Sequence, residues 1–283
     1  LNDLCFEDKW ILSKLNTVIR DVTDNMDKYE LGIAVQKVYD FLWDELCDWY
    51  IEMAKVRLWK ADENPKAAND ALWTLRTALT EGLKLLHPYM PFITEEIYCT
   101  LLPEEESIMI SDWPVFQEAW VFPEAEKAVE SFKEAVRGIR NTRTEMNVPM
   151  NRKTHLYIVG KDTDTCTRYE ACKKSFVNLA FAKEIHVQEN KNGIGEDAVS
   201  VVVSDAVVYM PLEDLVDREK EMERLKKEQE RLTKEIARCQ GMLNNPNFVN
   251  KAPEAKVNAE KEKLQKYEEM MEKVNVQLKQ MEK

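Results

Sequence analysis

Residues 212–283 carry the pattern that most restricts how this chain can fold. Residues that could line the contact between two paired helices, here called the seam, recur there at alternating intervals of three and four. This is the 3.5-residue repeat of a coiled coil. One polar step near Arg218 interrupts the repeat. The pattern consists of two runs: Leu215, Met222, Leu225, Gln229, Leu232, Ile236, Cys239 and Leu243, then Val257, Glu260, Leu264, Tyr267, Met271, Val274, Leu278 and Met281.

The segment between these two runs, NNPNFVNKAP at 244–253, is rich in residues that end helices. We therefore predict that residues 212–283 form an antiparallel two-helix coiled-coil hairpin. Each helix of about 30 residues would be about 45 Å long at the rise of an α-helix. Folding back about the loop should bring Leu243 level with Val257, and Arg238 level with Lys263. Such a hairpin buries only a narrow seam, which suits a projecting arm.

Residues 1–150 contain segments whose apolar residues recur every three or four positions. This spacing predicts amphipathic helices over 11–26, 35–53, 68–86 and 129–139. In LHPYMPFITEEIY, His87 and Pro88 end one helix and Pro91 starts the next, since proline is favoured in a first helical turn. His87 is expected to cap the helix that it ends. The short connections predict an antiparallel helix bundle.

Residues 151–211 change in character. Four short β-branched or alternating runs, THLYIV, AKEIHV, AVSVVV and AVVYM, predict strands. TRYEACKKSFVNLAF, between the first two runs, predicts a helix. We expect a small α/β connector here. With only 7 glycines in 283 residues, the whole chain is predicted to be mainly α.

Several classes of function find no support in the sequence. No apolar run approaches the length of a membrane span, and the start, LNDLCFEDKW, has no signal-peptide pattern. The six cysteines are scattered, which indicates free thiols in a reducing compartment, and no metal site is predicted. The three histidines lie in unrelated contexts, and no nucleotide-binding or zinc-protease motif occurs. No catalytic residues are predicted.

The charge distribution points to local sites for a polyanion. The net charge is −12, yet Glu213–Lys283 carries equal numbers of acidic and basic residues, so the excess lies in 1–212. Arg238 and Lys263 would flank the hairpin seam at one height and could clamp a phosphate; ordinary solubilising charge is the alternative. On the last bundle helix, four basic residues share a face and could bind phosphates, pair with neighbouring acids or dock the α/β unit. They are Lys133, Arg137, Arg140 and Arg143.

Four segments together resemble the valyl-tRNA synthetases, class I aminoacyl-tRNA synthetases. They are WILSKLN (10–16), FLWDELCDWYIEMAK (41–55), LLHPYMPFITEEIY (85–98) and GIRNTRTEMNVP (138–149). HPYMPFITEE is shared with the leucyl and isoleucyl enzymes, whereas DELCDWYIEMAK and IRNTRTEMNVP are more selective. The C-terminal hairpin is similar to the tRNA-binding arm of the valyl enzymes. The resemblance covers essentially the whole chain.

The resemblance implies three parts: an anticodon-binding helical bundle at 1–150 with its first helix missing, a connector at 151–211 and a tRNA-binding arm at 212–283. The HIGH and KMSKS motifs of the ATP-using catalytic domain are absent from the sequence, as is the editing domain. The expected chain is therefore a cytoplasmic, monomeric portion of a valine–tRNA ligase that binds tRNA(Val) without catalysing aminoacylation. It would hold no cofactor, since ATP and Mg²⁺ belong to the missing domains.

The same resemblance ranks the candidate tRNA contacts. Arg238 and Lys263 come first, because family members carry basic residues at matching positions. Arg137, Arg140 and Arg143 come second, since they could instead serve the interface with the missing catalytic body. Two alternatives remain open: the C-terminal part of an isoleucyl- or leucyl-like enzyme, and a non-enzymatic coiled-coil scaffold.

Overall fold

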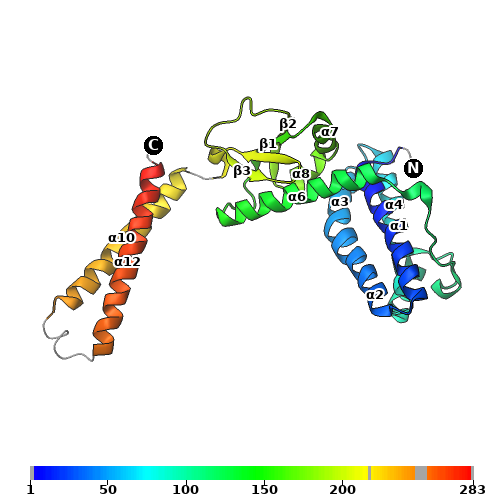
Figure 1. Ribbon diagram of the computed structural model, residues 1–283, viewed down its shortest axis with the longest axis horizontal. Helices are drawn as coiled ribbons and strands as arrows, with labels where there is room; N and C mark the ends of the chain where they lie inside the picture. Colours follow the sequence, from blue (N-terminus) through cyan, green and yellow to red (C-terminus); the bar gives the residue numbers. More distant parts are fainter. Residues whose placement is uncertain (1–2, 216–217, 246–253, 282–283) are drawn as a thin grey trace. The chain divides into compact units, whose positions relative to one another are not determined.

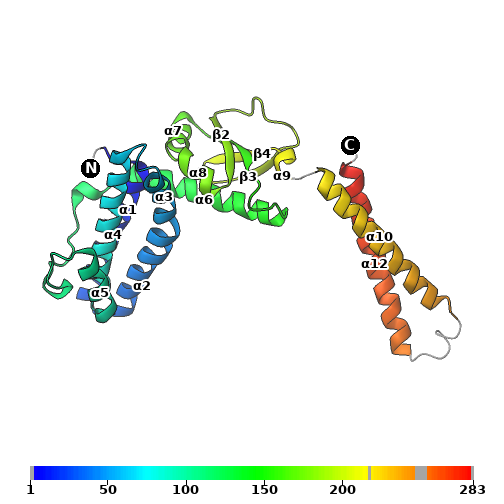
Figure 2. The same ribbon diagram turned by 180° about the vertical axis from the view of Figure 1, so that it is seen from behind.

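The computed structural model describes residues 3–215, 218–245 and 254–281. The chain divides into two compact units, Leu1–Pro211 and Leu212–Lys283, which are described separately below. Opposite views of the ribbon are given in Figures 1 and 2. The further division of the first unit at residue 150 stays a prediction. No helix within the described ranges is long and apolar enough to cross a membrane.

The first unit begins with a bundle of antiparallel helices, drawn in blue to teal in Figure 1. Its central helix, α1, buries Trp10, Ile11, Leu12 and Leu15 completely. The elements of the bundle are α1 (Phe6–Asp27), α2 (Leu31–Asp40), the π-helical segment η1 (Phe41–Tyr50), α3 (Ile51–Trp59), α4 (Pro65–Leu86), α5 (Pro91–Leu101) and the short 3₁₀ turns η2 (Ile108–Ile110) and η3 (Glu118–Trp120). The helices predicted over 11–26 and 68–86 are therefore present as α1 and α4.

One predicted helix departs from regular geometry. The spacing over 35–53 predicts one α-helix, but its central ten residues form the π-helical segment η1 between α2 and α3. Two consecutive aromatic side chains at the end of η1 are both buried and face different neighbours. Trp49 packs edge-on against Phe132, while the Tyr50 hydroxyl donates to Asp8. Apolar spacing reports which residues are buried, but the hydrogen-bond pattern of the helix depends on its neighbours.

The two prolines near residue 90 act as predicted. Helix α4 ends at Leu86, and α5 begins with Pro91 in its first turn. His87 occupies the C-cap position, but its imidazole bonds to the next helix: Nδ1 lies 2.7 Å from Thr94 Oγ1. The buried Thr94 hydroxyl donates to the Met90 carbonyl oxygen at 2.8 Å, so Nδ1 is assigned as the donor to Thr94. His87 thus fixes the corner between α4 and α5.

Helix α6 (Pro123–Glu145) extends from the bundle along the α/β part, as Figure 1 shows. The sheet has the order β2-β1-β4-β3, with β1 and β2 parallel and the other pairs antiparallel. The single predicted helix is divided at Cys172 into two. The elements are β1 (Thr154–Gly160), α7 (Thr163–Ala171), α8 (Lys173–Leu179), β2 (Ala182–Gln188), β3 (Val199–Val202) and β4 (Ala206–Met210). The mainly α fold with a small α/β connector is confirmed.

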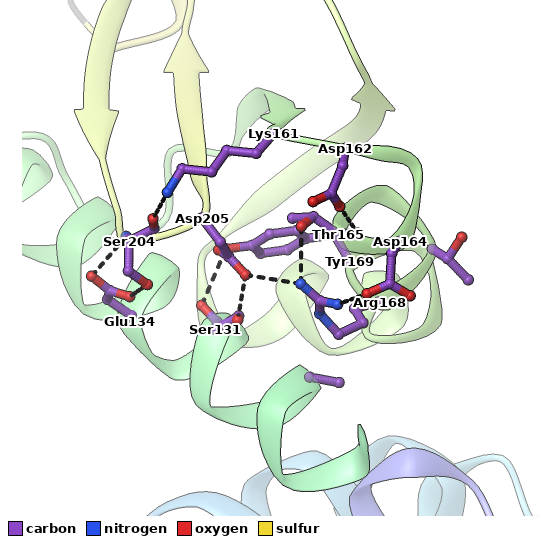
Figure 3. Close-up of polar contacts among 12 residues, drawn as sticks. Ser131, Glu134, Lys161, Asp162, Asp164, Thr165, Arg168, Tyr169, Ser204 and Asp205 are labelled. Carbon is purple, nitrogen blue, oxygen red and sulfur yellow. Dashed lines mark hydrogen bonds and ion pairs between the residues drawn. The ribbon is translucent and has the colours of Figure 1, made fainter. Parts of the chain in front are cut away.

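A polar cluster joins α6 to the α/β part (Figure 3). Asp205, between β3 and β4, accepts a hydrogen bond from Ser131 on α6 at 2.7 Å and one from the Tyr169 hydroxyl on α7 at 2.9 Å. Arg168 lies 3.4 Å from the same carboxylate. Nearby, Glu134 on α6 accepts the backbone N–H of Ser204 at 3.0 Å. These contacts fix the sheet against α6.

The second unit, the arm, consists of α9 (Leu212–Leu215), α10 (Arg218–Leu243) and α12 (Glu254–Met281). Leu225, Leu232, Val274 and Leu278 form the core of its seam, with Tyr267 and Met271 packed against them. A hydrogen bond of 2.6 Å from Gln229 to Asn275 also crosses the seam. The antiparallel helix pair is confirmed. The tip loop predicted at 244–253 lies, from residue 246 on, outside the described residues.

Candidate nucleic-acid interface

Arg238 and Lys263 lie at one height on the arm. Arg238 comes from α10 and Lys263 from α12, and both side chains approach the carboxylate of Glu260. The guanidinium lies 3.6 Å from Glu260 Oε1, and the ammonium lies 3.3 Å from Oε2. Their side chains are nevertheless 51% and 56% exposed. The level placement predicted from the repeat is confirmed. Arg238 also donates from Nε to Glu235 on its own helix at 3.0 Å, and both cations keep about half of their side-chain surface exposed.

Glu260 is the side chain at this place whose role the sequence reasoning missed. It occupies a seam position and is only 6% exposed. The buried Cys239 thiol donates to its Oε1 at 3.2 Å. This hydrogen bond, with Lys263 and Arg238, holds the pKa of the Glu260 carboxyl below its usual value. An acidic residue at a seam position, three residues before a lysine, is the signal that could have identified it.

The first residue of the basic face on α6 is fully engaged inside the fold. Lys133 is 3% exposed, and its ammonium lies 2.6 Å from Glu45 and 3.5 Å from Glu130. It also lies over the rings of Trp10 and Trp49, 5.1 and 5.5 Å from their centroids. The sequence left open whether the basic residues of α6 bind phosphates, pair with acids or dock the α/β unit. Lys133 pairs with acids.

Two further arginines of this face hold the α/β part. Arg143 is 4% exposed and donates to the carbonyl oxygens of Pro149 and Arg152 at 3.1 and 2.6 Å. Its guanidinium is therefore used inside the fold and is poorly placed for a phosphate. Arg140 is more exposed, but it donates from Nε to the Leu179 carbonyl oxygen at 2.8 Å. Docking of the α/β unit, one of the open alternatives, applies to both.

Arg137 differs from its neighbours on α6. It is exposed, and its guanidinium lies 5.3 Å from the centroid of the Trp49 ring. Stacking on an aromatic ring orients a guanidinium without using its donors for another acceptor. Of the three arginines predicted on α6 as tRNA contacts, Arg137 therefore has the geometry that best suits a phosphate. Its contact with tRNA stays a prediction.

Exposed aromatic side chains add candidates that the sequence reasoning did not single out. Trp59, at the end of α3, is 74% exposed. Two lysines that follow it in the sequence are each paired with an acid at the surface: Lys60 with Glu63 at 3.1 Å, and Lys66 with Asp70 at 3.0 Å. Phe92 is 91% exposed at the start of α5, followed by Glu95 and Glu96. Trp59, unlike Phe92, is followed closely in the sequence by lysines.

Two family descriptions match this chain. Residues 8–158 match the anticodon-binding domain of tRNA ligase, and residues 217–282 match the valyl tRNA synthetase tRNA-binding arm. The first match covers more than half of the chain, so the chain belongs to the anticodon-binding domain family of tRNA ligases. Both descriptions name parts of tRNA ligases that bind tRNA or its anticodon. Residues 217–282 are similar to the arm of the valyl-tRNA synthetases.

Curated relatives agree with this assignment. The chain is 51% identical to the valine–tRNA ligase of Clostridium tetani over 96% of its length, and 48% identical to that of Clostridium perfringens over 94%. With the valine–tRNA ligase of Staphylococcus carnosus, the identity is 38% over 99% of the chain. The matched region spans 30–32% of the length of these relatives. The resemblance drawn from the four motifs is confirmed.

Proposed function

We propose that this chain is the tRNA-binding portion of a valine–tRNA ligase and that its RNA is tRNA(Val). The observation that carries the proposal for the arm is the convergence of two half-exposed cations, Arg238 and Lys263, from different helices at one point. A paired cation site on a long, narrow support suits a phosphate of a folded RNA, which proteins recognise largely by shape and backbone. The arm would contact the outer corner of the tRNA.

The bundle would contact the anticodon stem-loop. Unpaired bases of an RNA loop are commonly bound by stacking on aromatic side chains beside cations. Trp59 with Lys60 and Lys66 supplies that combination. Arg137, exposed on α6, would add a phosphate contact. The scaffold alternative finds no support in the two family matches, both of which describe tRNA contact.

The complete ligase would attach valine to tRNA(Val) with ATP and Mg²⁺, as a cytoplasmic monomer. The residues of this chain do not fit those groups. The sequence contains neither HIGH nor KMSKS, and no group of three metal-ligating side chains occurs in the described part. We assign the ATP-dependent chemistry to other domains of the enzyme. This chain would contribute by orienting the tRNA.

Replacing both Arg238 and Lys263 with alanine should weaken binding of tRNA(Val) by about tenfold at moderate salt. Two phosphate contacts would be lost, so the slope of log affinity against log salt should become shallower by about two. Filter binding over a salt series measures both quantities. Binding of an isolated anticodon stem-loop should not change, because that RNA lacks the outer corner that the arm is proposed to contact.

The matched control removes two other exposed cations of the arm, Arg231 and Lys256, which lie at different heights. The affinity of this Arg231→Ala/Lys256→Ala variant for tRNA(Val) should fall about twofold, the effect of removing two positive charges from the arm. If it weakens binding as much as the Arg238→Ala/Lys263→Ala variant does, the phosphate contact is not localised. If wild-type chain does not prefer tRNA(Val) over unrelated tRNAs, the proposed specificity is wrong.

Trp59→Ala should weaken binding of the isolated anticodon stem-loop by about tenfold, since stacking of one base contributes about 1–3 kcal/mol. Phe92→Ala is the matched control, because it removes an even more exposed ring that is followed in the sequence by acidic residues. Fluorescence anisotropy with a labelled stem-loop compares the two variants. Equal affinities for both would remove Trp59 from the proposed interface.

A further inference from the structure

Glu260 is an unusual residue for its position. It lies in the arm seam, where Val257 and Val274 are buried apolar residues, yet it carries a charge at 6% exposure. A buried carboxylate generally stabilises a helix pair less than a well-packed apolar residue would. Seam stability therefore does not explain its presence.

Both oxygens of the Glu260 carboxylate are engaged. Oε1 accepts from the Cys239 thiol at 3.2 Å and lies 3.6 Å from the Arg238 guanidinium. Oε2 lies 3.3 Å from the Lys263 ammonium. Cys239 is fully buried and comes from the facing helix, so it helps to fix the carboxylate across the seam. Arg238 also donates from Nε to Glu235 on its own helix at 3.0 Å, so its guanidinium is held between Glu235 and Glu260. The Glu260 carboxylate thus contacts two long side chains of different helices at the surface.

We propose that Glu260 is a positioning residue that holds Arg238 and Lys263 as a two-cation cradle for one phosphate of the RNA backbone. The inference rests on the proposed function of the arm. Long basic side chains lose conformational freedom when they bind a phosphate, and a shared internal anchor reduces that loss. Each cation keeps exposed donors for the ligand, since Lys has three donors and Arg has five.

This role predicts an effect opposite in sign to that of simple electrostatics. Removing a negative charge from an RNA-binding surface should strengthen binding if only net charge matters. If Glu260 positions the two cations, Glu260→Gln should instead weaken binding of tRNA(Val) to the full chain, by about fivefold. The slope of log affinity against log salt should also become shallower, because the phosphate contacts are less completely formed.

Glu262→Gln is the matched control. It removes the same charge from the same helix, at an exposed position two residues away. Affinity for tRNA(Val) should be unchanged or slightly higher. Glu260→Leu tests whether the arm still folds, since leucine fits the seam. The helix content and melting temperature of this variant, measured by circular dichroism, should equal or exceed those of wild type. Its affinity for tRNA(Val) should still fall about fivefold.

Glu260→Gln in the Arg238→Ala/Lys263→Ala background separates this inference from the proposed function. There, Glu260→Gln should have no further effect, because the residues that it positions are gone. If Glu260→Gln binds as tightly as Glu262→Gln while the double alanine variant is weakened, the positioning role is wrong and the arm contact stands. If the double alanine variant binds like wild type, the arm contact itself fails.

Discussion

Replacing Asp8 with alanine should lower the free energy of unfolding of the first unit by about 3–5 kcal/mol, the typical cost of leaving a buried charge without its partner. Asp8 is completely buried in α1. Its two oxygens accept from the Arg57 guanidinium on α3 at 2.6 and 2.7 Å, and Oδ1 also accepts from the Tyr50 hydroxyl at 2.7 Å. The substitution leaves a largely buried guanidinium uncompensated. Urea denaturation followed by circular dichroism measures the loss.

Two variants test the reason for this loss. Glu63→Ala breaks an exposed ion pair with Lys60 and should change stability by less than about 1 kcal/mol. Asp8→Leu/Arg57→Met replaces both charges with apolar groups and should recover most of the stability, because no charge is left unpaired. If Asp8→Ala costs no more than Glu63→Ala, the buried ion pair does not stabilise the bundle as its geometry indicates.

Phe132→Ala should cost about 3–5 kcal/mol, through lost apolar burial and the cavity that remains. Phe132 is fully buried on α6. Its ring packs edge-on against Phe176 of α8, with centroids 4.6 Å apart, and against Trp49 of η1 at 6.2 Å. The side chain therefore links the bundle to the α/β part. Hydrogen exchange should show lower protection in both parts, not in α6 alone.

The controls for Phe132 vary size and burial separately. Phe132→Leu keeps much of the volume and should cost roughly 1–1.5 kcal/mol. Phe92→Ala removes the same ring from an exposed position and should change stability by about 0.5 kcal/mol or less. Equal losses for Phe132→Ala and Phe92→Ala would show that the link through α6 does not hold the two parts together.

Local patterns in the sequence were sufficient for most of the secondary structure and for the arm, but not for the π-helical segment η1 or the break at Cys172. Helix spacing, the prolines at the α4–α5 corner and the alternating runs predicted the elements that form, because each depends on residues close in the chain. The register of the arm followed as well. Folding two regular repeats back about a short loop leaves one arrangement that buries both seams, so Arg238 and Lys263 come level.

The candidate site could be predicted only in part. Four basic residues on one face of α6 look equivalent in the sequence, yet Lys133 pairs with acids, Arg140 and Arg143 hold the α/β part, and Arg137 is exposed. The differences arise from partners far away in the chain. Glu45, for example, precedes Lys133 by 88 positions. Helical spacing contains no information about such contacts.

The sequence by itself determined the helices, the strands and the antiparallel arm, because hydrophobic periodicity and helix-ending residues act over short distances along the chain. Only the tertiary structure decided which cations are exposed at the surface. Whether an arginine is exposed or engaged depends on how distant segments pack and on which acceptors they bring within hydrogen-bonding distance. The same holds for Glu260: the repeat placed it in the seam, and the packed helices placed Cys239, Arg238 and Lys263 around its carboxylate.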